Sequence, residues 1–225
     1  MRCIVTAGPT YEPLDKVRRL TNFSTGQLGS ELASFLTEQG HEVTLLLGQL
    51  ATYHGIPHAQ SVQTFSTTKD LRDHLRALGG VAVNAVFHAA AVNDFTFGKI
   101  WNRSEHGQLT EISAGKLSTR AGTLLAELLP TPKIISDLRE FFPKALLVGW
   151  KYEVDGDHAN VVRLAQEQMA ACRTDACVAN GPAYGAGFGL VHLNGCTHHE
   201  TNNSLFAALG TLVQEPVRKP TNAIA

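Results

Sequence analysis

The sequence predicts an α/β fold: a doubly wound, mostly parallel sheet of the Rossmann-like kind with helices on both faces. Short apolar runs typical of buried strands alternate with segments of helical period along most of the chain. The chain opens with a strand, a helix and a second strand, which is a βαβ unit. Its 225 residues, 44% of them hydrophobic, can bury one substantial core. We expect a single domain over residues 1–215 and a frayed tail over 216–225.

The opening strand, residues 2–6, ends at a Gly-Pro turn, because proline cannot continue a strand ladder. Residues 11–23 are then expected to form an extended excursion. The first helix follows, and Ser24, Thr25 or a near neighbour should cap its N-terminus. Apolar residues recur at helical spacing until Gly40 ends this helix.

The remaining elements alternate in the same way, with turn residues between them. Expected strands lie at residues 41–47, around Val62, and at 82–91, 124–129, 145–150, 176–179 and 190–193. Expected helices lie at residues 69–78, 133–142, 158–172 and 203–215. Residues 96–123 have little amphipathic period, so we expect irregular structure there, of the kind that is usually functional or mobile.

Residues 17–29 concentrate groups that can hold an anion. The backbone amides of residues 24–29 would point outward at a helix N-terminus, where unpaired N–H groups and the helix dipole favour negative charge. Arg18 and Arg19 add positive charge, and the Asn22 side chain can both donate and accept. A Gly-rich turn that lets a helix and a strand pack closely is the alternative interpretation.

The composition limits the kinds of molecule that the chain is expected to bind. The formal net charge of −1 argues against broad binding to nucleic acid or a membrane surface, so an anion site must be local and its ligand a small molecule. The four cysteines lack paired metal spacing and are expected to be reduced, mostly buried thiols. Because no signal h-region and no long apolar run is found, we expect a cytoplasmic protein.

The sequence lacks the motifs of several common kinds of metal-binding and catalytic site. The ten histidines do not form a metal set, since the adjacent pair His198 and His199 lacks the spacing of three or four that one helix face requires. The sequence contains neither a Gly-x-Ser-x-Gly nucleophile elbow nor a P-loop.

Two further residues are candidates for a ligand site. Asp94 follows the strand expected at residues 82–91, at the edge of the sheet where open α/β folds bind ligands. Lys116 is a candidate cation for phosphate. The alternatives are a turn or helix-cap role for Asp94 and a solvated surface position for Lys116.

An oxidoreductase of the short-chain kind and a nucleotide-using ligase both fit these features. The oxidoreductase is suggested by the Gly-rich residues 25–29 and by the alanines at 89–91. A dinucleotide fingerprint should follow the first strand directly, whereas 17 residues separate Thr6 from Ser24. No tyrosine is followed four positions later by a lysine, as the catalytic pair of short-chain enzymes would require.

The motifs of the chain closely resemble phosphopantothenoylcysteine synthetases (phosphopantothenate–cysteine ligases), which belong to the DNA/pantothenate metabolism flavoprotein C-terminal domain family. The resemblance covers nearly the whole chain in the order of the family, at residues 6–15 (TAGPTYEPLD), 17–18 (VR), 22–29 (NFSTGQLG), 90–95 (AAVNDF), 115–118 (GKLS), 131–135 (TPKII), 148–153 (VGWKYE) and 178–180 (VAN). Nothing in the chain resembles the flavin-dependent decarboxylase to which many bacteria fuse this ligase, so we expect the stand-alone form.

The resemblance implies a reaction in two steps, in coenzyme A biosynthesis. The carboxylate of 4'-phosphopantothenate attacks the α-phosphate of CTP or ATP and releases pyrophosphate. The amine of cysteine then displaces the nucleotide from the acyl-nucleotidylate. The resemblance also implies Mg²⁺ to carry the charge of the pyrophosphate, and a homodimer in which the Asn22 loop completes the neighbour's site. An inactive relative is the alternative within the family.

The resemblance also assigns roles to residues of this chain. Asn22 should hold the acyl-nucleotidylate, Arg18 should support its loop, and Lys116 should contact nucleotide phosphate. The expected nucleotide-binding residues are Gly8, Ser24, Gly26, Ala90, Asp94, Pro132, Lys133, Ile134, Ile135 and Trp150, where Trp150 replaces the usual Phe. The expected substrate-binding residues are Asn22, Ala91 and Asn180.

Two departures from the family pattern stand out. The helix before residues 178–180 carries Gln, Glu and Met at 166–169 where the family often has lysines, and only Arg173 is a nearby cation. The segment between Asp94 and Lys116 is longer than usual, which makes Lys99 a rival for the nucleotide lysine. The register from Lys116 to residues 132–135 favours Lys116.

Overall fold

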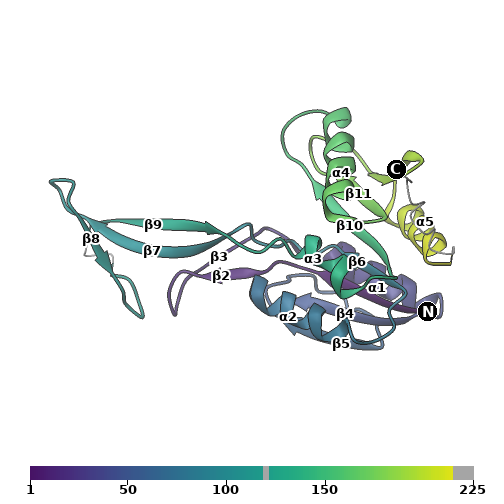
Figure 1. Cartoon of the computed structure of the whole chain (residues 1–225), viewed down its shortest axis with the longest axis horizontal. Helices are drawn as coiled ribbons and strands as arrows, with labels where there is room; N and C mark the ends of the chain where they lie inside the picture. Colours follow the sequence, from purple (N-terminus) through teal and green to yellow (C-terminus); the bar gives the residue numbers. More distant parts are fainter. Residues whose placement is uncertain (119–121, 215–225) are drawn as a thin grey trace, which may run out of the picture.

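The main body of the molecule is an eight-stranded sheet (Figure 1). The computed structural model describes residues 1–118 and 122–214. The strands of this sheet are β1 (Arg2–Ala7), β4 (Glu42–Gly48), β5 (Ser61–Phe65), β6 (Ala85–His88), β10 (Leu146–Tyr152), β11 (Ala176–Asn180), β12 (Phe188–His192) and β13 (Gly195–His199). Their order is β13-β12-β11-β10-β6-β1-β4-β5. The six strands from β11 to β5 are parallel, and β12 and β13 add an antiparallel edge.

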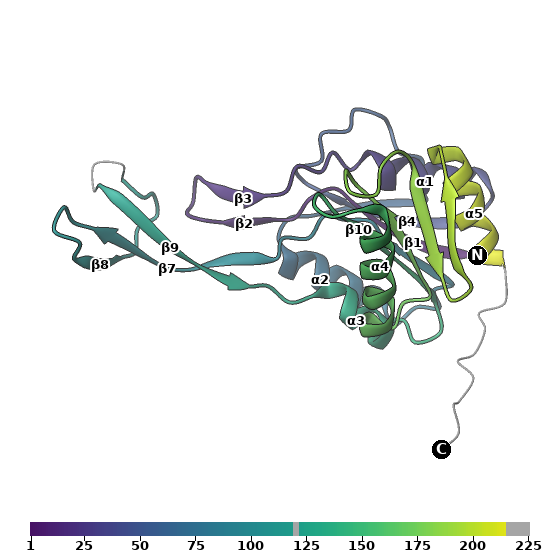
Figure 2. The same cartoon turned by 90° about the horizontal axis from the view of Figure 1, so that it is seen from above.

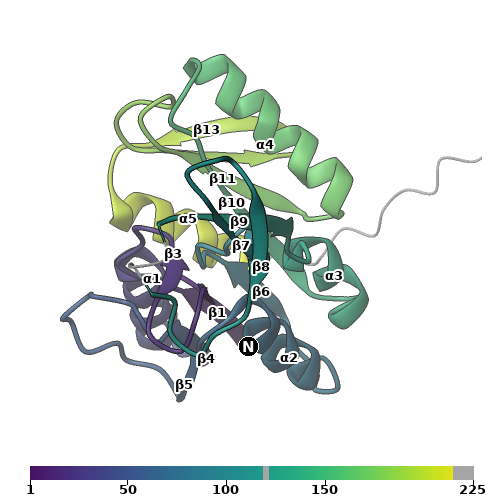
Figure 3. The ribbon, with the colours of Figure 1, turned by 90° about the vertical axis from the view of Figure 1, so that its left-hand side faces the viewer.

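Helices cover both faces of this sheet, which confirms the predicted doubly wound fold (Figure 3). The helices are α1 (Gln27–Glu38), α2 (Thr68–Leu78), α3 (Ile134–Phe141), α4 (His158–Cys172) and α5 (Asn202–Gln214). Helices α1 and α5 lie on one face, and α2, α3 and α4 on the other. Side chains of β1 alternate between the two cores: Cys3 and Val5 join the first, and Ile4 joins the second.

The chain winds outward in both directions from β1. It continues to β4 and β5 on one side, and to β6, β10 and β11 on the other. The strand order therefore reverses between β1 and β6. In open α/β sheets, ligands bind outside the carboxyl ends of the strands at such a point.

Two β-structures project from the body in the same direction (Figures 1 and 2). The hairpin consists of β2 (Tyr11–Pro13) and β3 (Arg19–Thr21). The arm is a three-stranded antiparallel sheet of β7 (Phe95–Arg103), β8 (Leu109–Ile112) and β9 (Thr123–Pro130). Strand β2 packs beside β7, so the hairpin accompanies the arm.

The expectation of irregular structure over residues 96–123 was therefore wrong, although the strand expected at 124–129 is present. No strand of the arm has a fully buried face, and its residues are exposed or half-buried. Without a buried face, the sequence need not alternate between apolar and polar residues, so the periodicity that reveals a strand is missing.

Smaller corrections concern the ends of elements. Helix α1 begins at Gln27, and its N-cap is Gly26, at φ 79°, without a side-chain cap. The hydroxyl of Thr25 instead accepts from the amide of Gln27 at 3.2 Å. The strand expected at residues 82–91 is shorter, at 85–88, and β13 was not predicted. The expected helix end at Glu215 and the tail at 216–225 lie outside the described residues.

Candidate functional site

A cavity of about 480 Å³ lies at the carboxyl ends of β6 and β10, beside the start of α3. Its lining comes from four parts of the chain: the segment from the end of β6 to the start of β7, the segment from the end of β9 to the first turn of α3, one side chain of β10 and one of α4. The lining residues are His88, Ala90, Val92, Asn93, Asp94, Phe95, Pro130, Thr131, Pro132, Lys133, Ile134, Ile135, Trp150 and Gln168. Seven of the ten residues predicted to bind nucleotide are among them.

The end of β6 is fixed to β1 by hydrogen bonds. The Thr6 hydroxyl accepts from the amide of Ala90 at 3.1 Å and lies 2.9 Å from Nδ1 of His88. His88 is buried, and burial lowers its pKa to about 4. The His88 ring is therefore neutral near pH 7 and can donate or accept a hydrogen bond, but adds no positive charge.

The base of the arm forms part of the cavity. The backbone carbonyl of Asp94 accepts from the amide of Thr131 at 2.9 Å, which joins the start of β7 to the end of β9. Because Asp94, Phe95 and Pro130 all line the cavity, a movement of the arm would change its shape. The Asp94 side chain is exposed.

The first turn of α3 adds donors. No side chain caps this helix, whose N-cap is Lys133. The first amides of a helix have no partner within it, so those of Ile134 and Ile135 are available to an anion. The ammonium of Lys133 lies on an exposed side chain of the cavity lining. This turn is the most cationic part of the lining, because His88 is neutral.

Trp150 and Gln168 close the cavity from β10 and α4. The Gln168 amide donates to the Trp150 carbonyl at 3.2 Å, which fixes the orientation of its side chain. The indole N–H of Trp150 is buried without a hydrogen-bond partner. Gln168 is thus the member of the lysine-poor stretch at 166–173 that reaches the cavity.

Asn22 and Ala91 are brought together beside the cavity. The Asn22 side-chain amide donates to the carbonyls of Ala91 and Val92, each at 3.2 Å. Asn93, which is 3% exposed, donates to the carbonyl of Leu20 at 3.0 Å and so holds the hairpin against the same loop. The segment that leads from the hairpin to α1 is therefore docked on the loop after β6.

Glycines allow the loops after β1 and β4 to approach α1 closely. A Cβ at Gly26 would lie 3.2 Å from the Gly8 backbone and 3.0 Å from Ala51 Cβ, and both glycines have positive φ. Gly8 and Gly26 are thus required by close packing, and neither lines the cavity; Ser24, between Asn22 and Gly26, does not line it either.

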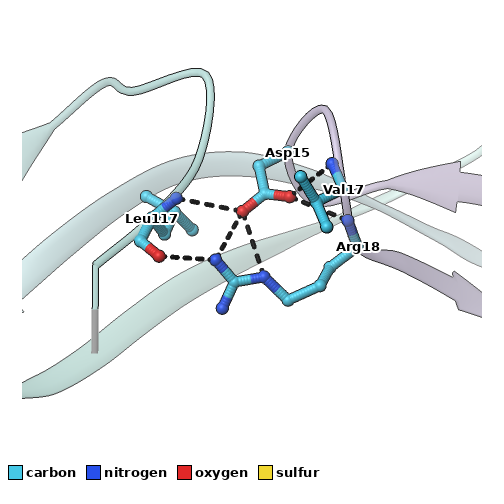
Figure 4. Close-up of polar contacts among 4 residues, drawn as sticks. All are labelled: Asp15, Val17, Arg18 and Leu117. Carbon is cyan, nitrogen blue, oxygen red and sulfur yellow. Dashed lines mark hydrogen bonds and ion pairs between the residues drawn. The ribbon is translucent and has the colours of Figure 1, made fainter.

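Arg18 and Lys116 are both outside the cavity lining. Arg18 lies where the hairpin meets the arm (Figure 4). The Arg18 guanidinium pairs with Asp15 at 2.7 Å and donates to the carbonyl of Leu117 at 2.6 Å. Lys116 is exposed beside this contact. Asn180, at the end of β11, is also outside the cavity lining, and its side-chain oxygen is buried without a partner.

Sequence reasoning missed His88 and Gln168. A histidine inside an apolar strand, two residues before the quoted motif at 90–95, was a detectable signal. The helical period of residues 161, 165, 169 and 172 also places position 168 on the inward side of α4.

No group of three or more His, Cys, Asp or Glu side chains that could hold a metal ion is found in residues 1–118 and 122–214. Mg²⁺ commonly binds through one or two carboxylates together with substrate phosphates. Asp94 supplies one carboxylate to the cavity, so the lining fits Mg²⁺ that arrives with a nucleotide. Within the same residues, no helix is long and apolar enough to cross a membrane.

Comparison with known proteins relates the chain to one family. The family model for the DNA/pantothenate metabolism flavoprotein C-terminal domain matches residues 1–204. The coenzyme A biosynthesis bifunctional protein CoaBC of Thermococcus kodakarensis is 31% identical over 180 residues, which are 80% of this chain and 41% of that protein. The protein of the same name from Bacillus subtilis is 31% identical over 189 residues, 83% of this chain and 42% of that protein. The chain thus spans less than half the length of these relatives.

A solved structure gives the same result. The crystal structure of the DNA/pantothenate metabolism flavoprotein from Streptococcus pneumoniae superposes with a TM-score of 0.82 at 26% identity. The match covers 95% of this chain and 98% of that one.

Proposed function

The chain belongs to the DNA/pantothenate metabolism flavoprotein C-terminal domain family, and on this premise we propose that it is a phosphopantothenate–cysteine ligase of coenzyme A biosynthesis, acting in the cytoplasm. The observation that carries the proposal is the family match over residues 1–204 together with a cavity lined by Ala90, Asp94, Trp150 and the turn at 132–135. These are residues for which the motif resemblance predicts nucleotide binding.

In the first step, a carboxylate oxygen of 4'-phosphopantothenate forms a bond to the α-phosphorus of CTP or ATP. The bond from that phosphorus to the pyrophosphate oxygen breaks. In the second step, the cysteine nitrogen bonds to the acyl carbon, the nucleoside monophosphate leaves, and the ammonium proton passes to solvent.

The cavity suits the first step because anionic reactants must be held together. The amides of Ile134 and Ile135 and the ammonium of Lys133 offset phosphate charge at the start of α3. Neutral His88 and Ala90 form an uncharged side for the nucleoside. Asp94 would hold Mg²⁺ together with the nucleotide phosphates, and the ion would supply positive charge to offset theirs.

Asn22 suits the acyl-nucleotidylate role because its amide is already anchored to the carbonyls of Ala91 and Val92. Its side-chain oxygen remains as an acceptor and its position is fixed. We propose that Asn22, Ala91 and Asn180 contact the pantothenoyl part, with Gly8, Ser24 and Gly26 shaping the loop beside the phosphates.

We also propose a homodimer in which the hairpin and arm of one copy complete the cavity of the other. Two features support this arrangement. Lys116 is outside the cavity lining of its own chain, and the arm exposes large apolar side chains that a monomer would leave in water. Lys116 would then reach phosphate in the neighbour's site.

The proposal is tested with purified protein, 4'-phosphopantothenate, cysteine, Mg²⁺ and either CTP or ATP, by following pyrophosphate. We expect pyrophosphate only when the pantothenate acid is present, and the amide product only when cysteine is added. Absence of pyrophosphate with both nucleotides would contradict a ligase. Oxidation of NAD(P)H with a carbonyl substrate would instead support the oxidoreductase.

A further inference from the structure

The Asp15 carboxylate, at the tip of the hairpin, is 1% exposed and accepts five hydrogen bonds (Figure 4). One oxygen accepts from the amides of Val17 and Arg18, each at 2.8 Å. The other accepts from the Leu117 amide at 3.0 Å and from two nitrogens of the Arg18 guanidinium at 3.1 and 2.7 Å. Asp15 therefore links the hairpin to the segment between β8 and β9.

This link fixes the backbone on both sides of Lys116. The Leu117 amide and carbonyl are bound by Asp15 and Arg18, and the Gly115 carbonyl accepts from the amide of Lys16 at 3.0 Å. Leu117 is 4% exposed, so its side chain also anchors the segment. The Lys116 side chain is exposed between these two fixed residues.

We propose that Asp15 is a positioning residue for Lys116, which it holds at a set place relative to the hairpin that leads to Asn22. The inference rests on the proposed ligase function. A lysine on a free loop would lose backbone freedom whenever it bound phosphate, and this loss would weaken binding. The clasp formed by Asp15, Arg18, Gly115 and Leu117 removes that cost in advance.

A carboxylate is required here because all five partners are N–H donors. Asparagine at position 15 has one acceptor oxygen, and its NH₂ group would face either the amides of Val17 and Arg18 or the Leu117 amide and the guanidinium. Hydrogen bonds, foremost from the Leu117 amide, also hold the pKa of Asp15 far below its ordinary value, so the carboxylate stays ionised near neutral pH.

A double-mutant cycle tests the proposal with pyrophosphate formation as the measurement. We expect Asp15→Asn to raise the nucleotide KM and to lower kcat/KM about tenfold or more. In a chain that already carries Lys116→Gln, the same change should cost less than about threefold, because Asp15 acts through Lys116. Asp15→Glu, which keeps two acceptor oxygens, should recover part of the loss. If the two changes lower kcat/KM independently, so that the loss in the double variant is the product of the single losses, the proposal is overturned.

Amide hydrogen exchange tests the clasp without activity. Asp15→Asn should accelerate exchange across residues 113–118 about tenfold while strands of the main sheet keep their protection. Unchanged exchange there would overturn the proposal even if the enzyme is active. If the parent chain forms no pyrophosphate, the ligase function fails, while this measurement still decides whether Asp15 orders the segment. Should Asp15→Asn not fold, Arg18→Gln, which removes the guanidinium bonds to Asp15 and to the Leu117 carbonyl, enters both experiments in its place.

Glu111→Gln is the matched control on the arm. It removes a carboxylate four residues before Gly115 that pairs with Lys99 at 3.0 Å, but the pair is exposed and Glu111 takes part in none of the hydrogen bonds that form the clasp. Exposed ion pairs contribute little to stability. The amide exchange rates at 113–118 and the nucleotide KM of Glu111→Gln should therefore stay within about twofold of the parent.

Discussion

Lys99 and Lys116 both belong to the arm region, but their surroundings differ. The Lys99 ammonium donates a hydrogen bond to the Glu111 carboxylate at 3.0 Å, and this bond raises the pKa of Lys99. Within the described part of the chain, no ion pair is found for Lys116. An ammonium without a carboxylate partner is the better candidate for phosphate, because it need not exchange one anion for another.

We therefore expect Lys116→Gln to lower pyrophosphate formation by roughly 10²- to 10³-fold, the usual effect of removing a group that stabilises developing charge. Lys99→Gln should stay within about threefold of the parent. Both variants are measured at saturating nucleotide. The reverse ranking would move the phosphate role to Lys99.

Asn22→Asp should preserve the fold but slow the second step, so that the acyl-nucleotidylate accumulates or leaks. Aspartate cannot donate to the carbonyls of Ala91 and Val92, and its charge would repel the phosphate of the intermediate. We expect at least a tenfold loss of amide product, with the intermediate detected by mass spectrometry after rapid quench. Parent-like turnover would remove Asn22 from the mechanism.

His88 should make folding sensitive to acid. Its pKa is about 4 in the folded chain, below the ordinary value of 6.5, so only the unfolded chain gains a proton as the pH falls from about 6.5 to 4. The stability that neutral His88 contributes is thus complete above pH 6.5 and is lost as the pH falls toward 4. The unfolding free energy decreases by about 3 kcal/mol in total. His88→Gln should show a smaller loss of unfolding free energy between pH 7.5 and 4.5. Urea unfolding at both pH values measures this loss, and an equal loss in the two proteins would contradict a buried neutral His88.

At the scale of elements, the packing of α1 on β1 depends on a residue without a side chain. A Cβ at Gly29 would lie 2.6 Å from Ala7 Cβ and 3.0 Å from the Thr6 carbonyl. Gly210 in α5 offers a matched comparison, because a Cβ there would meet only Phe35 at 3.4 Å, an ordinary contact.

Gly29→Ala should therefore destabilise the fold by about 1–3 kcal/mol despite the higher helix propensity of alanine. Gly210→Ala should be neutral or stabilising by up to about 1 kcal/mol. Chemical denaturation of both variants measures the difference. Equal stability of the two would mean that α1 can shift away from β1 without cost.

The sequence predicted the strands of the main sheet other than β13, because they carry buried side chains. Strand β13, which was not predicted, is exposed or half-buried along its length. The helix expected at residues 158–172 has the observed bounds, since Val161, Ala165, Met169 and Cys172 recur on its buried side. The arm could not be predicted in this way. Its strands are held by pairing with one another and expose both faces, so backbone hydrogen bonds rather than a hydrophobic pattern define them.

Some residues of the candidate site could be predicted from the sequence and others could not. Motifs led to Ala90, Asp94 and Trp150, which meet in the cavity. Gln168 comes to the same cavity from α4, and only the packing of that helix reveals it. The clasp at Asp15 joins positions about a hundred residues apart, and no local pattern indicates such a contact.

At the scale of the whole molecule, the arm has too little buried surface to be explained as part of a monomer. Phe95, Leu109, Leu125, Leu128 and Leu129 are all exposed large apolar side chains of its strands. The hairpin beside it exposes Leu20, and Phe23 follows it. Large apolar side chains exposed in such number on one projecting structure mark an interaction site, and a second copy of the chain is the partner that the proposed shared cavity requires.

Leu128→Glu should therefore weaken the dimer by at least tenfold in dissociation constant, because a carboxylate would be buried at the interface. Sedimentation velocity over a concentration series measures this change, and pyrophosphate formation should fall with the fraction of dimer. Leu193→Glu is the control: this leucine is 92% exposed at the turn between β12 and β13, away from the arm, and should alter neither measurement. A fully active monomer in either the parent or Leu128→Glu would exclude the shared cavity and require Lys116 to reach the nucleotide of its own chain.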